Sequence, residues 1–194
     1  MAREFELKAV VADPAECVRR IHAAGGRLTE RGRLEDRRWD NAAGELSARD
    51  EVLRLRVLRK ADGTSQATMD WKGPTGFEQG YKVREELSFP ITDPDGFAHV
   101  LERLGFRVTH AIDRDIEMYE VPGGHARIER YPRMDVLVEV EGAPETIERA
   151  IAATGIPREQ FTTDRLTEFA ARFAGRTGQQ PFLSDADRSG ASNG

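Results

Sequence analysis

Several short segments of this chain alternate between charged and apolar residues, with the charges on one parity. In residues 52–58, for example, Arg54 and Arg56 alternate with leucine and valine. Because successive side chains of a β-strand point to opposite faces, each such segment is predicted to form a strand with one charged and one apolar face. Similar segments occupy residues 4–8, 68–72, 82–87, 114–119, 126–131 and 137–141. The chain is therefore predicted to be rich in strands whose apolar face must be covered.

Three segments place a proline eleven residues before a glycine, as helix start and stop signals do. Proline suits the first turn of a helix, and glycine can adopt the left-handed conformation that ends one. The segments span residues 14–25, 94–105 and 144–155, and each follows a predicted strand. A further amphipathic helix is predicted over residues 164–173. The pattern predicts an α+β fold in which a strand followed by a helix occurs three times.

The length and composition of the chain indicate one cytoplasmic domain. The 194 residues are 39% hydrophobic and 32% charged, which suffices for a domain over residues 1–174, with residues 175–194 expected to form a mobile tail because they lack periodicity. Met1 leads directly into charged residues and no long apolar stretch follows, so neither a secretory signal nor a spanning helix is expected. The single cysteine, Cys17, excludes internal disulfides. The net charge of −5 argues against nucleic acid as a partner.

The charged face of the predicted strands contains almost only acids and bases. Its bases are Lys8, Arg54, Arg56, Lys72, Lys82, Arg84, Arg114 and Arg127, and its acids are Glu4, Glu6, Asp70, Glu86, Glu129, Glu139 and Glu141. One interpretation is a flat sheet whose solvated face carries weak cross-strand ion pairs. The other is a sheet that curls around these groups as a channel. There, clustered carboxylates would bind a hard divalent cation and the bases would bind phosphate oxygens.

A set of motifs in a fixed order resembles the CYTH, or triphosphate tunnel, family, which includes class IV adenylate cyclases and thiamine triphosphatases. The motifs are Glu4-x-Glu6-x-Lys8, Leu53-Arg54-Leu55-Arg56, Lys72-Gly73-Pro74, Lys82-x-Arg84-x-Glu86, Leu104-Gly105-Phe106 and Glu139-x-Glu141. Together they cover roughly residues 1–173. The resemblance implies an eight-stranded antiparallel β-barrel that is open as a tunnel, with helices packed outside. It also implies a cytoplasmic enzyme that acts on a small-molecule triphosphate with Mg²⁺ or Mn²⁺; assembly as a homodimer stays open.

By position, the resemblance also implies roles for individual residues. The expected metal-binding carboxylates are Glu4, Glu6, Glu139 and Glu141, with Glu129 where the family commonly has aspartate. The expected triphosphate-binding bases are Lys8, Arg54, Arg56, Lys72, Lys82, Arg84, Arg114 and Arg127. Lys72 is expected either to act as general base, if neighbouring positive charge lowers its pKa, or only to pair with phosphate.

One departure from the family pattern concerns Ile116. It shares the parity of Arg114, so an apolar side chain is expected on the charged inner face where the family has a base. Either Arg114 and Arg127 compensate for the missing base, or the ligand has an apolar part near Ile116. A third reading is that the strand register is shifted by one residue and Ile116 belongs to the core.

The same set of residues is compatible with three functions. Metal-dependent hydrolysis of an inorganic or organic triphosphate, such as tripolyphosphate, ATP or thiamine triphosphate, is our first prediction, because no feature of the sequence indicates recognition of adenine. Cyclisation of ATP to cyclic AMP differs from it only in the attacking group, which would be a ribose hydroxyl in place of water. The third function is binding of a polyphosphate or nucleotide without catalysis.

Overall fold

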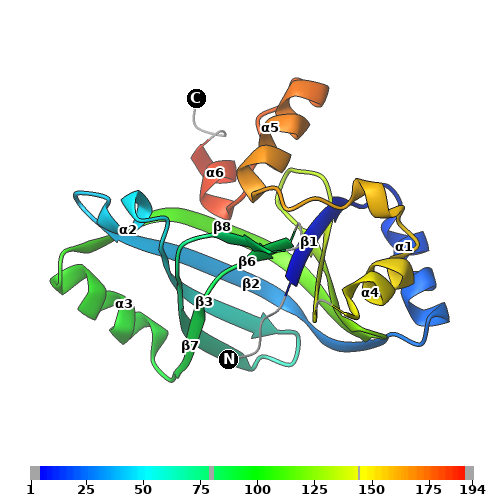
Figure 1. Ribbon diagram of the computed structural model, residues 1–194. Helices are drawn as coiled ribbons and strands as arrows, with labels where there is room; N and C mark the ends of the chain where they lie inside the picture. Colours follow the sequence, from blue (N-terminus) through cyan, green and yellow to red (C-terminus); the bar gives the residue numbers. More distant parts are fainter. Residues whose placement is uncertain (1–4, 79–80, 144, 191–194) are drawn as a thin grey trace.

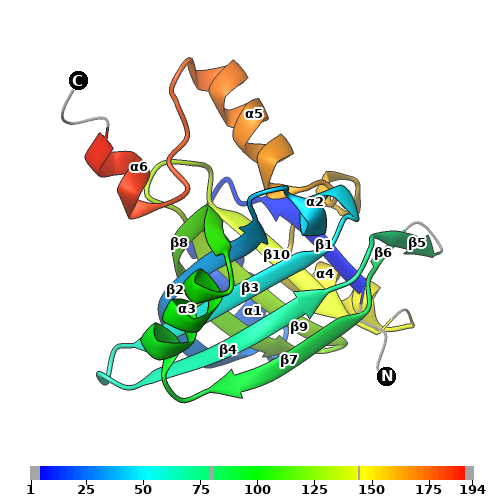
Figure 2. The ribbon, with the colours of Figure 1, turned by 90° about the vertical axis from the view of Figure 1, so that its left-hand side faces the viewer.

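The computed structural model describes residues 5–78, 81–143 and 145–190. In this part of the chain, ten antiparallel strands form one sheet that curls, with helices on its outer side (Figures 1 and 2). The strands are β1 (Phe5–Val10), β2 (Arg27–Asn41), β3 (Val52–Lys60), β4 (Ser65–Lys72), β5 (Gly76–Glu78), β6 (Tyr81–Val83), β7 (Glu86–Ile91), β8 (Phe106–Val121), β9 (Gly124–Arg130) and β10 (Leu137–Gly142). Their order across the sheet is β5-β6-β1-β10-β9-β8-β2-β3-β4-β7.

The two ends of this sheet are formed by neighbouring parts of the chain. β6 pairs with β1 and β7 pairs with β4, yet only Arg84 and Glu85 separate β6 from β7. Val83 and Glu86 are three residue steps apart, which span about 11 Å at most, so this connection brings the two ends close together. The Gly73 N–H, just beyond β4, also donates to the Glu85 carbonyl at 2.9 Å. The sheet therefore curls into a tunnel, although β5 and β7 are not paired in the described residues.

The expected α+β fold, an antiparallel tunnel with external helices, is confirmed, with ten strands in place of eight. Part of the difference arises because the expected strand 82–87 divides into β6 and β7 at opposite ends of the sheet. The hairpin of β5 and β6 adds a further strand. Residues 27–41, for which we predicted no strand, form β2 at the centre of the sheet.

Three of the helices lie where the proline and glycine signals indicate, the third of them beginning at Ile147. The helices are α1 (Pro14–Ala23), α2 (Glu45–Ala48), α3 (Pro94–Arg103), α4 (Ile147–Thr154), the 3₁₀ turn Arg158–Gln160, α5 (Leu166–Thr177) and α6 (Asp185–Gly190). Asp13 and Asp93 cap α1 and α3 by accepting a backbone N–H at 3.0 and 2.9 Å. β1 leads into α1, β7 into α3 and β10 into α4, so the three predicted strand-and-helix units are confirmed. Pro144, the expected start of the third helix, lies outside the described residues.

The apolar face of the sheet is covered by these helices in two places. One core cluster includes Phe5, Leu7, Val138 and Val140 of the sheet, packed with residues of α1 and α4. Cys17 of α1 is buried in it. A second cluster, further along the sheet, joins Trp39, Leu55 and Met69 to α3. Figure 1 shows α1 and α4 together near one end of the sheet and α3 near the other. The opposite, charged face is left to line the tunnel.

The segment after residue 175 differs from our expectation of a tail without structure. α5 continues to Thr177, and Phe182 is buried and pairs its backbone with Arg133. The Arg133 guanidinium also lies 3.5 Å from the centre of the Phe182 ring. α6 follows, so apolar and cation–π contacts hold this segment where hydrophobic periodicity gave no signal. Residues 191–194 lie outside the described residues. Among the described helices, none has the length and apolar character needed to cross a membrane.

Candidate functional site

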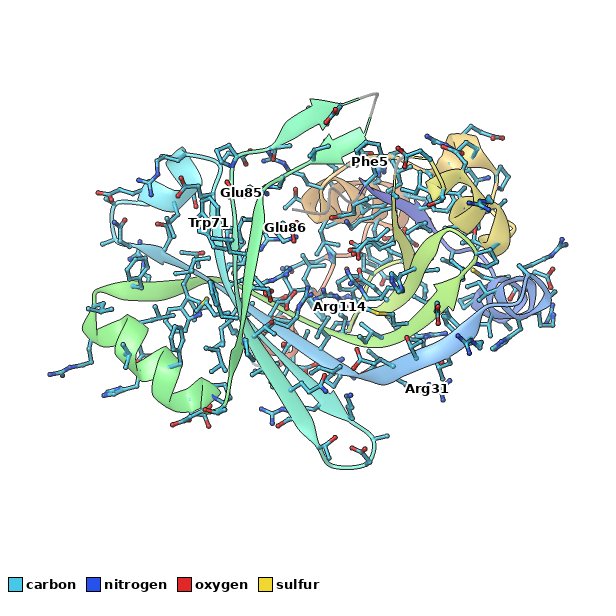
Figure 3. All side chains as sticks on the ribbon, turned by 60° about the horizontal axis from the view of Figure 1, so that its bottom comes forward. Phe5, Arg31, Trp71, Glu85, Glu86 and Arg114 are labelled. Carbon is cyan, nitrogen blue, oxygen red and sulfur yellow. The ribbon has the colours of Figure 1, made fainter. Side chains whose placement is uncertain are left out.

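The curled sheet encloses a cavity of about 940 Å³ whose walls are mostly charged. The inner faces of β1, β2, β3, β4, β8, β9 and β10 form the walls, and residues from α5 and from 183–187 line it as well. Its acidic and basic lining includes Glu6, Lys8, Asp36, Arg38, Asp50, Arg54, Arg56, Lys72, Arg84, Glu86, Arg114, Arg127, Glu129, Glu139 and Glu141. Figure 3 shows Arg114 within the space that the sheet encloses and Arg31 on its outer side. The structure therefore has a charged channel, the second of the two arrangements that the alternating residues allowed.

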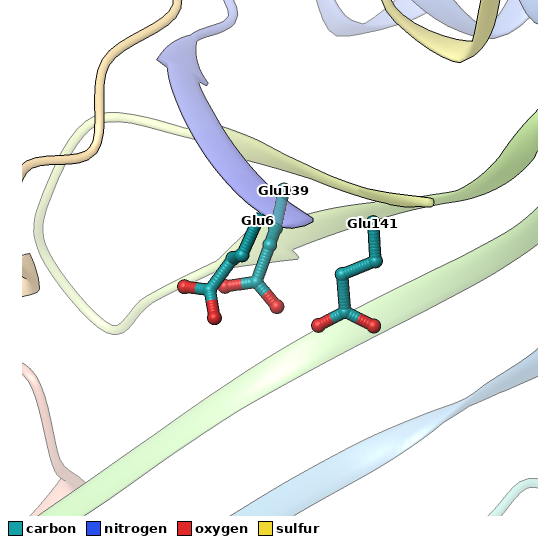
Figure 4. Close-up of side chains that lie close together, drawn as sticks. All are labelled: Glu6, Glu139 and Glu141. Atoms are coloured by element: carbon teal, nitrogen blue, oxygen red, sulfur yellow. The ribbon is translucent and has the colours of Figure 1, made fainter. Parts of the chain in front are cut away.

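Three carboxylates come together on one wall of this cavity. Glu6 of β1 lies directly opposite Glu141 of β10, and Glu139 is two residues away on the same strand. One oxygen from each of the three lies within 4.8 Å of the others, and Figure 4 shows all three side chains pointing the same way from the two strands. Glu4, the fourth expected member, lies outside the described residues. The two strands hold these acids together because their charged positions share one parity.

The pKa values of the two carboxylates of β10 are shifted in opposite directions. Burial and the neighbouring Glu139 carboxylate raise the pKa of Glu141 to about 7. Burial also acts on Glu139, but the Arg127 guanidinium and the Lys8 ammonium outweigh it and hold the pKa of Glu139 well below its usual range. The Lys8 ammonium contacts the carboxylates of both Glu6 and Glu139. The Lys8 ammonium therefore compensates Glu6 and Glu139, while Glu141 remains a weaker acid.

This donor set suits a hard divalent cation. Mg²⁺ and Mn²⁺ prefer carboxylate oxygens, and three such groups converge here from adjacent strands. Burial and the Glu139 carboxylate raise the pKa of Glu141, and a cation bound beside it would lower that pKa. Glu6, Glu139 and Glu141 are thus the residues that could hold a metal ion.

The metal-free protein is expected to lose stability as the pH rises from about 5 to about 8. The pKa of Glu141 is near 4.5 when the chain is unfolded and about 7 when it is folded. A raised folded pKa means that its stabilising effect is complete below pH 4.5 and disappears as the pH rises through 7. Thermal unfolding in excess chelator, across this range, measures the effect. The variant Glu141→Gln is the control, and equal pH slopes for variant and wild type would contradict the assignment.

A chain of alternating charges connects these acids to the far wall of the tunnel. Arg127 joins Glu139 to Glu129, where its Nε donates at 2.9 Å. Arg114 joins Glu129 to Asp36, donating at 2.8 and 3.0 Å. Arg56 then donates to both oxygens of Asp36 at 2.9 and 3.2 Å. The buried charges are compensated by one another, so the tunnel can fold without a ligand.

Glu129 lines the tunnel on the parity of Arg127, where it contacts bases. Its carboxylate accepts from Arg114, from Arg127 and from the Tyr131 hydroxyl, the last at 2.6 Å. Burial would raise the pKa of Glu129, but the two guanidinium groups outweigh it and lower the pKa. Within the described residues, the carboxylate cluster that could hold an ion does not include Glu129. In this structure Glu129 is the partner of two arginines, and its expected role as a metal ligand stays a prediction.

The remaining predicted bases lie on the tunnel wall in different settings. Arg54 donates twice to one oxygen of Asp70, at 3.0 and 2.7 Å, and Ser88 donates to the other. Lys72 contacts Glu86 of the neighbouring strand, and burial together with the Arg54 guanidinium lowers the pKa of Lys72. Each base thus faces a carboxylate while lining the cavity.

Arg84 and Lys82 come from the segment that joins the two ends of the sheet. The Arg84 side chain donates to the carbonyls of Gly73 and Asp50, so it ties the turn after β4 to the start of β3. It still lines the cavity. The backbone of Lys82 pairs with Glu6, but its side chain lies outside the described part of the chain.

Ile116 lies on the inner face, as its parity predicted. It is fully buried and packs with Leu34 and Leu58. With Met118, these residues line a second cavity of about 310 Å³, which shares Arg54, Arg56 and Arg127 with the first. The register is therefore the predicted one, and an apolar region adjoins the charged cavity.

Sequence reasoning missed several residues that line the cavity. Asp36 and Arg38 belong to β2, in which the outward-facing residues Glu35 and Arg37 are also charged. Alternation of charged and apolar residues, the signal used for the other strands, is therefore absent. Tyr131 ends the predicted strand 126–131 on the parity of Arg127 and Glu129, but it is uncharged and was not selected. Ser184 carried no signal because it lies in the irregular segment after α5.

The chain was compared with known proteins by sequence and by fold. No family model matches the chain. A protein of Methanocaldococcus jannaschii with the name putative adenylate cyclase is 25% identical over 138 residues, which are 71% of this chain and 75% of that protein. The sequence similarity extends over most of both chains.

Two solved structures have the same fold. A putative adenylate cyclase from Vibrio parahaemolyticus is 18% identical, with a TM-score of 0.73 over 88% of this chain and 98% of that one. The Hippeastrum protein HpAC1, described as a putative adenylyl cyclase with a dominant triphosphatase activity, is 19% identical, with a TM-score of 0.62 over 95% of this chain and 99% of that one. The similarity to a putative adenylate cyclase and the shared fold agree with the resemblance to the CYTH family that the motifs indicated.

Proposed function

We propose that this protein hydrolyses a small-molecule triphosphate with the help of Mg²⁺ or Mn²⁺. The proposal depends on one observation: three converging carboxylates and many basic side chains line the same cavity. Carboxylates bind hard cations, and arginine and lysine bind phosphate oxygens. A metal-bound polyphosphate is a ligand that matches both halves of the cavity.

The residues of the chain would divide the work of phosphoryl transfer. Glu6, Glu139 and Glu141 would hold the cation, which when bound neutralises phosphate oxygens and lowers the pKa of water. Arg54 and Arg56 would stabilise the negative charge that develops on the departing phosphate. The tunnel walls would hold the phosphates in line and limit the access of bulk water.

Lys72 would remove the proton from the attacking water. Burial and Arg54 lower its pKa, which increases the fraction of neutral amine near pH 7. Its contact with Glu86 opposes this effect in the free protein. A phosphate that displaced Glu86 from Lys72 would leave the lysine paired with substrate alone, which is the alternative role for this residue.

Cyclisation of ATP to cyclic AMP is the second candidate function. It is favoured by the names of the similar proteins and by the cavity beside Leu34, Leu58 and Ile116, which offers apolar surface to the organic part of a triphosphate. Hydrolysis ranks first because it needs only the charged cavity, and because triphosphatase activity is described for HpAC1. The same apolar surface would favour an organic triphosphate over tripolyphosphate.

The products formed from different triphosphates would separate these functions. The protein is incubated with tripolyphosphate, ATP or thiamine triphosphate and with Mg²⁺ or Mn²⁺, and phosphate, pyrophosphate and cyclic AMP are resolved. Release of phosphate is expected. Cyclic AMP as the main product from ATP would reverse the ranking, and binding without turnover of any of the three would make the protein a polyphosphate-binding protein.

A further inference from the structure

Arg38 is an arginine of the tunnel to which neither the motifs nor the charge network gives a role. It lies on β2, two residues beyond Asp36 on the same inner face, and it lines the charged cavity. Asp36 is fully engaged by Arg56 and Arg114. Arg38 therefore stands next to the end of the alternating chain of charges without belonging to it.

Within the described part of the chain, the guanidinium group of Arg38 has no hydrogen-bonding or ion-pair partner. Arg38 differs in this from the other bases that line the cavity. Within residues 5–78, 81–143 and 145–190, each of the others forms a side-chain hydrogen bond or ion pair. Lys82 is not part of this comparison, because its side chain is not described. The Nε of Arg38 is buried and unpaired. A buried donor without an acceptor is unfavourable, and the cost is higher when the group is charged. The described residues therefore leave the charge of Arg38 without an ion-pair partner.

The surroundings of Arg38 are positively charged. Arg54 lies directly opposite it on β3, and like charges at opposite positions of two strands repel each other. Arg54 is satisfied by Asp70, which leaves Arg38 without an acid. Burial, Arg54, Arg114 and Arg84 all act to lower the pKa of Arg38, and Asp36 only partly offsets them. This corner of the cavity thus carries positive charge that an anion would compensate.

We infer that Arg38 binds a phosphate group of the substrate, together with Arg54 across the strand pair. A guanidinium presents several N–H groups in a plane and matches the oxygens of a phosphate. Arg54, Arg56, Arg114 and Arg127 share their donors with Asp36, Asp70, Glu129 or Glu139, and Arg84 and Arg165 share theirs with Asp50. Among the described residues no acid competes for the donors of Arg38, so a phosphate would not have to displace a carboxylate from it. The inference rests on the proposed function in that it requires a polyphosphate ligand.

Binding of an inert polyphosphate to Arg38→Gln tests this inference. The probe is imidotriphosphate, whose P–N–P bridges resist hydrolysis, and its dissociation constant is measured by calorimetry in the presence of Mg²⁺. Loss of one charged hydrogen-bonding partner is expected to weaken binding about tenfold to a hundredfold. Arg38→Lys, which keeps the charge without the planar group, should restore part of the loss. Arg59→Gln is the matched control, because Arg59 is exposed on β3 and pairs with Glu35 outside the cavity.

Unfolding of the ligand-free variant distinguishes ligand binding from a structural role. Because Arg38 is unpaired and close to other bases, Arg38→Gln should unfold at the same temperature as the wild type or at a higher one. Unchanged affinity of the variant for imidotriphosphate would overturn the inference. If its unfolding temperature were also several degrees lower, Arg38 would have a structural role instead. Wild type that binds the probe but turns over no triphosphate would contradict the hydrolysis proposal and leave Arg38 as an anion ligand. Absence of binding by the wild type would contradict both.

Discussion

Replacing Glu141 by Gln is expected to lower the rate of phosphate release by roughly a hundredfold or more while the protein stays folded. The substitution keeps the size of the side chain and removes the charge that the proposed cation needs. Glu141 is the best member of the cluster for this test, because its raised pKa shows that the free protein gains nothing from its negative charge. The ligand-free variant should therefore be as stable as the wild type near pH 8, or more stable.

The control for this experiment is Glu120→Gln. Glu120 is a half-exposed glutamate at the end of β8 that pairs with Arg27 outside the tunnel. Its rate of phosphate release should match that of the wild type. Initial rates at saturating substrate, with circular dichroism of each variant, give the comparison. A wild-type rate in Glu141→Gln would remove this residue from the site.

Removal of Arg114 is expected to have the largest effect on stability. Arg114 is buried between Asp36 and Glu129, and both carboxylates are buried as well. The two acids raise the pKa of Arg114 against the effect of burial. Arg114→Leu would leave two buried carboxylates with one partner fewer, and loss of one member of a buried pair typically destabilises a protein by about 3–5 kcal/mol. Urea unfolding at pH 7 measures the difference.

Two further variants test the cause of this effect. Arg31→Leu breaks an ion pair of similar composition with Glu117, but Arg31 is exposed, so its loss should cost less than about 1 kcal/mol. Combining Arg114→Leu with Glu129→Gln should recover part of the stability, because one of the two uncompensated charges is gone. A loss below about 1 kcal/mol for Arg114→Leu alone would contradict the role of the network.

The sequence predicted the parts of the fold that local signals encode. Proline and aspartate at the start of α1 and α3 gave their positions, and the parity of Arg54 and Arg56 gave the inner face of β3. Parity also predicted that Ile116 faces the tunnel. Each of these depends on the geometry of one helix or strand, so neighbouring residues suffice to predict it.

What the sequence left open depends on contacts between distant segments. β2 was not predicted because it lacks alternation of charged and apolar residues. Asp36 and Arg38 face the tunnel and Glu35 and Arg37 face outward, and all four are charged. Parity places Glu129 and Arg114 on one face but gives no distance between them. Their ion pair follows from the pairing of β8 with β9. The missing partner of Arg38 could be recognised only once the partners of its neighbours were known.

The requirement for a divalent cation tests the central claim most directly. Phosphate release from tripolyphosphate is followed by ³¹P NMR with wild-type protein and Mg²⁺ or Mn²⁺, then after addition of excess chelator, and again after the metal is restored. Because Glu6, Glu139 and Glu141 face a polyanion in one cavity, release should stop in chelator and resume with metal. Phosphate release that continues undiminished in excess chelator would contradict the proposed metal-dependent triphosphatase.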